Sequence, residues 1–125
     1  MERLNFINEQ MGVIAVPYEF GQWSSEIIYP YTVGEITENP TITEDGAEEA
    51  TMLLTVFHRG NFLDMETVKE KIKNHFSPVY GLRGITESGT TIVVFYDNAF
   101  YVPTGEADLK KLQINLKIYV WKGAI

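Results

Sequence analysis

The clearest pattern in the chain is a strict alternation of apolar and polar residues near its C-terminus. The apolar positions are Leu112, Ile114, Leu116, Ile118 and Val120, and Gln113, Asn115, Lys117, Tyr119 and Trp121 stand between them. A period of two residues is typical of a β-strand with one buried face. We therefore expect a long strand over 109–121, of about 43 Å at roughly 3.3 Å per residue, which bends or reaches past its sheet.

Five further segments have the pattern of strands. Residues 50–58 are apolar on both alternations, which predicts a central strand buried on both faces. Residues 25–37 predict a strand with Ile27, Tyr29, Tyr31 and Val33 on one face, and Pro30 places it at a sheet edge or a bulge. Residues 82–86 and 91–96 predict a hairpin, and a third short run follows at 99–102.

Two segments have the period of a helix. Residues 2–11 place Leu4, Ile7 and Met11 on one face, with Gly12 as the expected C-terminal cap. Residues 64–76 form the clearer helix, with Asp64 as its cap and Leu63 packed against Val68. Its apolar stripe consists of Met65, Val68, Ile72 and Phe76, and Ser77-Pro78 ends it.

This order of elements predicts an α+β fold, with a mainly antiparallel sheet and two helices packed on one face. At 125 residues and 45% hydrophobic composition, the chain is expected to be one domain over 1–125. Residues 38–49 contain Pro40 and Asp45-Gly46 among acidic residues, so we expect an exposed connection or a flexible hairpin tip there.

Charge is distributed unevenly along the chain. No lysine or arginine lies between Arg3 and Arg59, so residues 1–62 hold two basic and ten acidic side chains, against eight and seven in residues 63–125. An acidic surface disfavours nucleic acid and anionic lipid and attracts basic partners, although it can also serve solubility alone. The candidate acidic segment, facing a lumen or a partner, consists of Glu35, Glu38, Glu44, Asp45, Glu48 and Glu49.

Motifs that would indicate catalysis are missing from the sequence. There is no cysteine, the two histidines lack the spacing of a zinc site, and neither a phosphate-binding glycine loop nor a nucleophile turn occurs. We therefore expect no catalytic, cofactor-binding or metal-binding residues and no enzyme activity. No apolar run is long enough to span a bilayer, so we expect a soluble protein folded in a cytoplasm, without a membrane partner.

Aromatic residues gather on the predicted strands. Some fall on the alternation opposite the predicted core, so they either fill the core or pack against another subunit. The candidates for a subunit interface are Tyr29, Tyr31, His58, Arg59, Tyr119 and Trp121.

Several of these segments carry a resemblance to a known family. The strand Tyr29-Pro-Tyr-Thr-Val-Gly-Glu35, the acidic connection, Phe57-His-Arg-Gly60, the helix over 64–76 and the closing strand over 112–121 resemble the tail terminator, or tail-completion, proteins of long-tailed bacteriophages. The resemblance covers most of the chain and rests on structural residues. It implies an α+β subunit that forms a ring, usually a homo-hexamer, on the end of the tail tube.

In that setting, the ring stops tube growth and offers a surface for head–tail joining. The implied partners are copies of the chain, the tail tube protein and the head-completion or connector protein, and the implied location is the virion, after assembly in the bacterial host cytoplasm. DNA passes through the ring without sequence-specific binding, and acidic side chains lining the lumen would repel its phosphates. Two alternatives stay open: another phage neck or minor tail component, and a monomeric small-ligand-binding or enzymatic α+β domain.

Overall fold

The computed structural model describes residues 2–42 and 46–122, apart from the side chains of residues 39–42. It contains two helices, α1 (Glu2–Val13) and α2 (Phe62–Phe76). Its strands are β1 (Tyr18–Phe20), β2 (Tyr31–Ile42), β3 (Glu48–Arg59), β4 (Leu82–Ile85), β5 (Thr91–Val102) and β6 (Leu109–Trp121). All six belong to one sheet, whose strand order is β1-β2-β3-β6-β5-β4.

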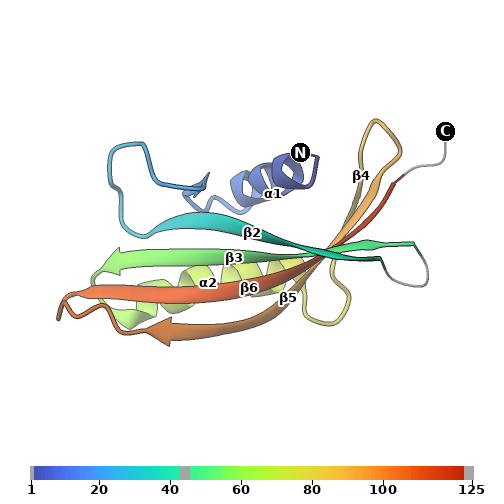
Figure 1. The fold of residues 1–125 in the computed structure, drawn as a ribbon. Coiled ribbons are helices and arrows are strands. Elements are labelled where there is room, and N and C mark those ends of the chain that lie inside the picture. The colour runs from blue at the N-terminus through green and yellow to red at the C-terminus, as the bar shows by residue number, and fades with distance from the viewer. Residues whose placement is uncertain (1, 43–45, 123–125) are drawn as a thin grey trace.

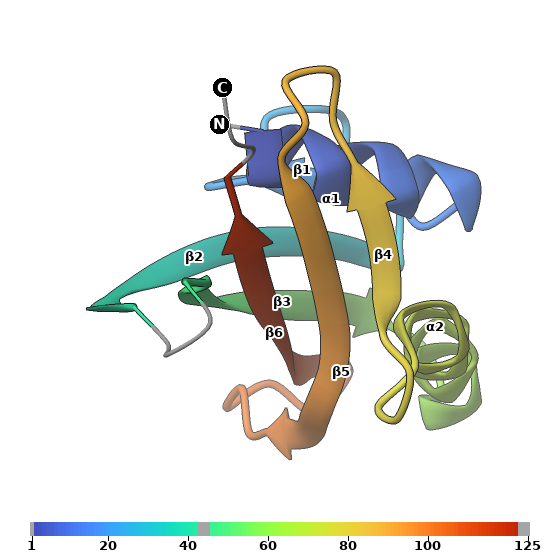
Figure 2. The same ribbon diagram turned by 90° about the vertical axis from the view of Figure 1, so that its right-hand side faces the viewer.

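The sheet is mainly antiparallel, since only the pairing of β1 with β2 is parallel. It curls strongly, so that β2 and β3 run across Figure 2 while β4 and β5 stand nearly upright. In Figure 1, α2 lies behind β3 and β6, and α1 lies beside β2. The predicted α+β class with a mainly antiparallel sheet is thus confirmed.

One face of the sheet carries the hydrophobic core. The even-numbered apolar side chains of β3 and β6 are buried there in one cluster with Ile7 and Met11 of α1. The predicted stripe of α2 joins the same cluster: Met65, Val68, Ile72 and Phe76. The odd-numbered side chains of β3 and β6 lie on the opposite face, here called the open face, where most are half-buried. β3 is central, as predicted, but it is fully buried on one face only.

The caps of both helices differ from the prediction. α1 continues past Gly12, and Ala15 adopts the left-handed φ of 56°. α2 begins two residues before Asp64, because the Asn61 side chain accepts a hydrogen bond of 3.0 Å from the Asp64 amide. The predicted packing of Leu63 on Val68 is therefore wrong. The hydrophobic position before this cap falls on Gly60, which has no side chain, and Leu63 is 72% exposed.

The strand predicted over 25–37 begins only at Tyr31. Residues 24–30 lie outside any strand, and the Glu19 carboxylate accepts hydrogen bonds from the backbone of Ser24 and Ser25, at 3.2 and 3.3 Å. The short β1 pairs with β2 in place of this segment, from Tyr18 opposite Thr32 to Phe20 opposite Gly34. No alternation announced it, because a three-residue strand is too short to show a period.

The segment 38–49 is mostly strand, which corrects the prediction of a connection. β2 extends to Ile42 and β3 starts at Glu48, and Ile42 pairs with Glu48. The alternative of a hairpin describes the segment better, although its turn at 43–45 lies outside the described residues. The predicted runs 91–96 and 99–102 are one strand, β5, which an irregularity between Tyr96 and Asn98 interrupts.

Candidate functional site

Four of the six predicted interface residues meet at one end of the sheet. Tyr29 enters from the segment before β2, Tyr31 begins β2, and His58 and Arg59 end β3. The Tyr29 and Tyr31 rings lie 5.7 Å apart, and Tyr31 stacks on Phe57 at 5.2 Å. We call this end of the molecule, where β3 stops and β6 starts, the Arg59 end.

Arg59 ties three segments of this end together. Its guanidinium donates to the Tyr29 hydroxyl at 3.2 Å and forms ion pairs with Glu106 at 3.0 Å and Asp108 at 2.9 Å. These partners raise the pKa of Arg59, and the hydrogen bond from Arg59 lowers the pKa of Asp108 below its usual 3.8. Through these two ion pairs Arg59 holds the β5–β6 loop in place. Because the two carboxylates offset its positive charge, Arg59 is poorly suited to bind an external anion.

His58 is held against the start of α2. Its Nε2 lies 3.0 Å from the Asp64 carboxylate, and the residue is only 6% exposed. A Cβ at Gly60 would lie 2.4 Å from Nε2, so the turn into α2 requires glycine beside this ring. A His–Asp pair is a common feature of general-base catalysis. Here the ring packs against Gly60 and the edge of Tyr29, so its geometry fits a structural link between β3 and α2.

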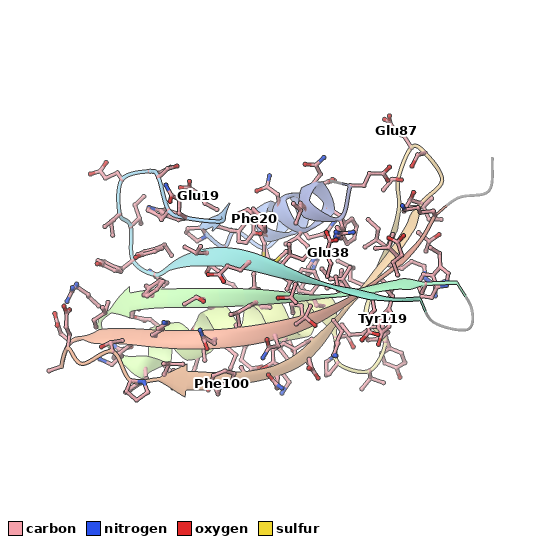
Figure 3. The ribbon with its side chains drawn as sticks, viewed as in Figure 1. Glu19, Phe20, Glu38, Glu87, Phe100 and Tyr119 are labelled. Atoms are coloured by element: carbon pink, nitrogen blue, oxygen red, sulfur yellow. The ribbon has the colours of Figure 1, made fainter. Side chains whose placement is uncertain are left out.

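Tyr119 and Trp121 lie far from the other four candidates, at the opposite end of β6. Their rings stack at 6.2 Å, and Phe95 of β5 contacts Tyr119 edge-on at 6.0 Å. All three are half-buried on the open face. Figure 3 shows Tyr119 beside the β2–β3 hairpin, away from Phe100 at the far part of β5. We call this second end the hairpin end. The predicted interface residues thus form two separate aromatic clusters.

Much of the acidic segment is neutralised by bases from elsewhere in the chain. Glu38 forms an ion pair with Arg3 of α1, Glu49 lies 3.5 Å from Lys117, and Glu48 lies 3.4 Å from Lys122. Glu35 is exposed on the open face opposite Leu53, and no ion pair of the described residues includes it. Glu44 and Asp45 lie outside the described residues. The sign seen in the sequence is therefore partly cancelled by the tertiary structure.

Two features of the Arg59 end were not predicted as site residues. The first is the exposed pair Ile27 and Ile28 in the segment before β2. The second is a groove of about 670 Å³ that the start of α2, the end of β5 and the β5–β6 loop enclose. Its lining includes Phe62, Tyr101, Val102, Pro103, Ala107 and Lys110. The sequence held one signal for them, since apolar residues outside the expected core period, such as Phe62 and Ile28, have no partner in the predicted core.

The groove is built around two aromatic rings. Phe62 and Tyr101 meet edge to face at 5.1 Å, and the Lys110 ammonium lies 5.0 Å from the centre of the Phe62 ring. The Tyr101 hydroxyl donates to Glu66, and burial raises the pKa of Tyr101 to about 12, with this bond as a further cause. The bond to Glu66 fixes the Tyr101 hydroxyl, and the two rings form an apolar wall of the groove. Lys110 and Lys111 also line it, together with Glu106, whose carboxylate is paired with Arg59.

A second hollow of about 630 Å³ lies between α1 and the β4–β5 hairpin at the other end of the molecule. Ser88 donates to the Glu2 carboxylate at 2.8 Å and contacts the hydroxyls of Thr86 and Thr90. Hydrogen bonding of the Glu2 carboxylate with Thr86, Ser88 and Thr90 lowers the pKa of Glu2, with Thr86 as the largest cause. The hydroxyl network attaches the hairpin to the start of α1.

Among the described residues, no group of three His, Asp or Glu side chains is arranged to hold a metal ion. Neither helix in this part of the chain has the length and apolar character to cross a membrane. The chain was also compared with known proteins. No protein-family model matches it, and no curated protein sequence does.

Proposed function

We propose that this chain is a structural protein of phage tail assembly, which caps the tail tube as an oligomeric ring and provides the head–tail joining surface. One observation carries the proposal: large apolar side chains are exposed at the Arg59 end on both edges of the sheet. They are Ile27 and Ile28 beside β2, and Phe62, Leu63, Phe100 and Tyr101 around the end of β5. Exposed apolar groups of this size mark surfaces that other proteins cover. A subunit with such groups on both flanks fits a ring, in which each copy has two neighbours.

The fold is well suited to such a ring. We infer that both helices pack on the core face, so that the open face stays available along the whole length of β6. Its aromatic cluster at the hairpin end, Phe95, Tyr119 and Trp121, offers the large rings that dominate protein interfaces. In this proposal the open face contacts the tail tube protein or the head-completion protein, and the protein resides at the tail–head junction of the virion.

The electrostatic part of the proposal centres on Glu35. Its carboxylate is exposed and has no ion-pair partner among the described residues, unlike Glu38, Glu48 and Glu49. An unpaired carboxylate repeated around a ring would repel DNA phosphates and let the duplex pass. We propose that Glu35, with Glu44 and Asp45, contributes the acidic surface that faces the lumen or a basic partner.

A phage in which the coding sequence is deleted tests the proposal directly. We expect tails of uncontrolled length without heads, seen by electron microscopy, and restoration of normal particles when the protein is supplied in trans. Purified protein added to growing tubes should stop their elongation and appear as a ring at one end. Normal tails in the deletion phage would refute the proposal.

The main alternative within phage biology is another neck or minor tail component. Electron microscopy of particles with tagged protein separates the two, because label elsewhere than at the head-proximal end of the tube would favour the alternative. The groove beside Phe62 is the observation that favours a small-ligand-binding domain. A protein that stays monomeric at all concentrations and in the presence of tubes would favour that function.

A further inference from the structure

The segment before β2 is held in place by hydrogen bonds and ring contacts, and it carries two isoleucines. The Glu19 carboxylate accepts hydrogen bonds from Ser24 and Ser25, including one of 2.6 Å from the Ser24 hydroxyl. The Trp23 ring lies 4.9 Å from that of Tyr31, and its indole N–H donates to the Glu26 carbonyl at 3.2 Å. These contacts hold both ends of the turn, and the pKa of Glu19 falls below its usual 4.5 because of the bonds from Ser24 and Ser25.

Two side chains of this segment are apolar and exposed to solvent. Ile27 is 56% exposed and Ile28 is 61% exposed. A loop held in place by six polar and aromatic contacts loses little conformational entropy when it binds. Two preordered isoleucines followed by the ring of Tyr29 therefore have the properties of a binding ridge, here called the Ile27 ridge (residues 26–28).

The Phe62 groove lies on the other edge of the sheet at the same end. β1 and β2 form one edge, and β5 with the short β4 forms the other. Figure 3 shows both places: Glu19 marks the loop above β2, and Phe100 marks the part of β5 that leads into the groove. The beginning of β5 pairs with β4, but no described strand pairs with residues 95–102 on that side. The groove is thus reachable from the side of the molecule.

We propose that the Ile27 ridge of one copy docks in the Phe62 groove of the next copy, and that this contact joins neighbouring subunits. The isoleucines supply apolar surface for Phe62 and Tyr101. Glu26, which has no ion pair among the described residues, meets Lys110, whose ammonium also lacks a carboxylate within ion-pair distance in that part of the chain. Apolar and charged groups therefore match on both sides.

The contact is heterologous, because ridge and groove are different surfaces. A contact of this kind leaves one free ridge and one free groove on each dimer, so it continues until the rotation closes a ring. Because both surfaces lie at the Arg59 end, neighbouring subunits would lie side by side, with the Arg59 ends of their sheets next to each other. The inference rests on the proposed ring and identifies the residues that join its subunits.

Cysteine cross-linking tests this contact in a chain that has no cysteine of its own. Ile27→Cys changes the ridge and leaves Ile28, and Ala107→Cys places a thiol in the groove without removing an aromatic ring. When the two variants are mixed and oxidised, we expect a disulfide-linked dimer that contains one copy of each. The double variant should give a ladder of oligomers. Each single variant alone should remain uncross-linked.

Ile85→Cys is the matched control, because Ile85 is an exposed apolar residue of β4, at the same edge of the sheet as the Phe62 groove. Cross-linking of Ile27→Cys to Ile85→Cys as efficiently as to Ala107→Cys would overturn the proposal. So would self-cross-linking of a single variant, which indicates a symmetric contact. No cross-link at any concentration would overturn it as well.

Charge reversal gives an independent measurement. Glu26→Lys and Lys110→Glu should each lower the yield of the mixed dimer about fivefold, and the two together should restore it. Unchanged yields would remove the ion pair from the contact. The outcome is separable from that of the ring function. Tube capping without this cross-link would refute the contact alone, whereas efficient cross-linking with no effect on tube growth would refute the capping function alone.

Discussion

Single residues at the Arg59 end act mainly by holding segments together. Arg59 joins Tyr29 to the carboxylates of Glu106 and Asp108, His58 joins β3 to Asp64, and Asn61 caps α2. His58 and Arg59 are both predicted interface residues, and the structure brings both into contact with Tyr29. Their neighbours from the β5–β6 loop, some 47 residues along the chain, could not be inferred from spacing.

The cap of α2 gives a prediction for one hydrogen bond. Asn61→Ala removes the acceptor of the Asp64 amide and should lower the free energy of unfolding by about 1 kcal/mol. Asn61→Asp keeps an acceptor and should stay close to the wild type. Urea unfolding followed by circular dichroism measures both. Equal stability of all three proteins would show that the bond contributes nothing.

Glu19 gives a prediction for pH. Its pKa in the folded protein is lowered by the bonds from Ser24 and Ser25, so the carboxylate holds the Ile27 ridge at pH values above 4.5. As the pH falls through the lowered pKa, protonation should weaken those bonds and loosen the ridge. In a Trp121→Phe background, Trp23 fluorescence should therefore change with a midpoint below 4.5, and Glu19→Gln should abolish this transition. A midpoint at 4.5 or above would contradict the assignment.

At the scale of elements, the apolar side chains of each helix and strand differ in whether the fold buries them. The stripe of α2 is buried as its period predicts, while Leu63 in the first turn is exposed. β6 shows the strict alternation of the sequence in its burial, with Leu112 to Val120 inside and the odd-numbered residues on the open face. The strand predicted over 25–37 is confirmed from Tyr31 onward and wrong before it, because its alternation of isoleucine and tyrosine extends into a segment that the Glu19 carboxylate and Trp23 hold outside the sheet.

Two truncations within α2 compare a buried with an exposed apolar side chain. Ile72→Ala empties a fully buried position and should cost roughly 2–4 kcal/mol of unfolding free energy. Leu63→Ala removes side-chain atoms that face solvent and should change it by less than about 0.5 kcal/mol. Chemical denaturation of both variants under the same conditions is the measurement. A large loss for Leu63→Ala would restore the packing on Val68 that the sequence suggested.

At the scale of the whole molecule, the curl of the sheet brings the two halves of the chain together. α1 reaches β4 at the far edge of the sheet, where a Cβ at Gly84 would lie 2.2 Å from the Phe6 ring. Arg3 of α1 forms an ion pair with Glu38 of β2, and the pairing of β3 with β6 places Lys117 and Lys122 beside Glu49 and Glu48. Some acidic side chains of the first half of the sequence therefore lie beside basic groups, while other described carboxylates, such as Glu26 and Glu35, form no ion pair.

Charge reversal separates paired from unpaired acids. Glu49→Lys places a second ammonium group beside that of Lys117 and should lower the unfolding free energy by about 1 kcal/mol. Glu35→Lys changes an exposed, unpaired carboxylate and should leave stability unchanged while reducing the yield of infectious particles. Thermal unfolding and plaque counts on a complemented deletion phage measure the two effects. Full infectivity of Glu35→Lys would show that this carboxylate has only a solvating role.

The periods of the elements, and therefore the class of the fold, follow from the amino-acid sequence alone. The alternation of β6, the apolar run of β3 and the stripe of α2 are local patterns that chain geometry converts directly into buried faces. Three features emerge only from the folded chain: which charges are neutralised, the separation of the aromatic candidates into two clusters, and the position of a ridge and a groove on opposite edges at one end. Those features depend on side chains that meet across long stretches of chain, and ion pairs such as Arg3–Glu38 leave no period in the sequence.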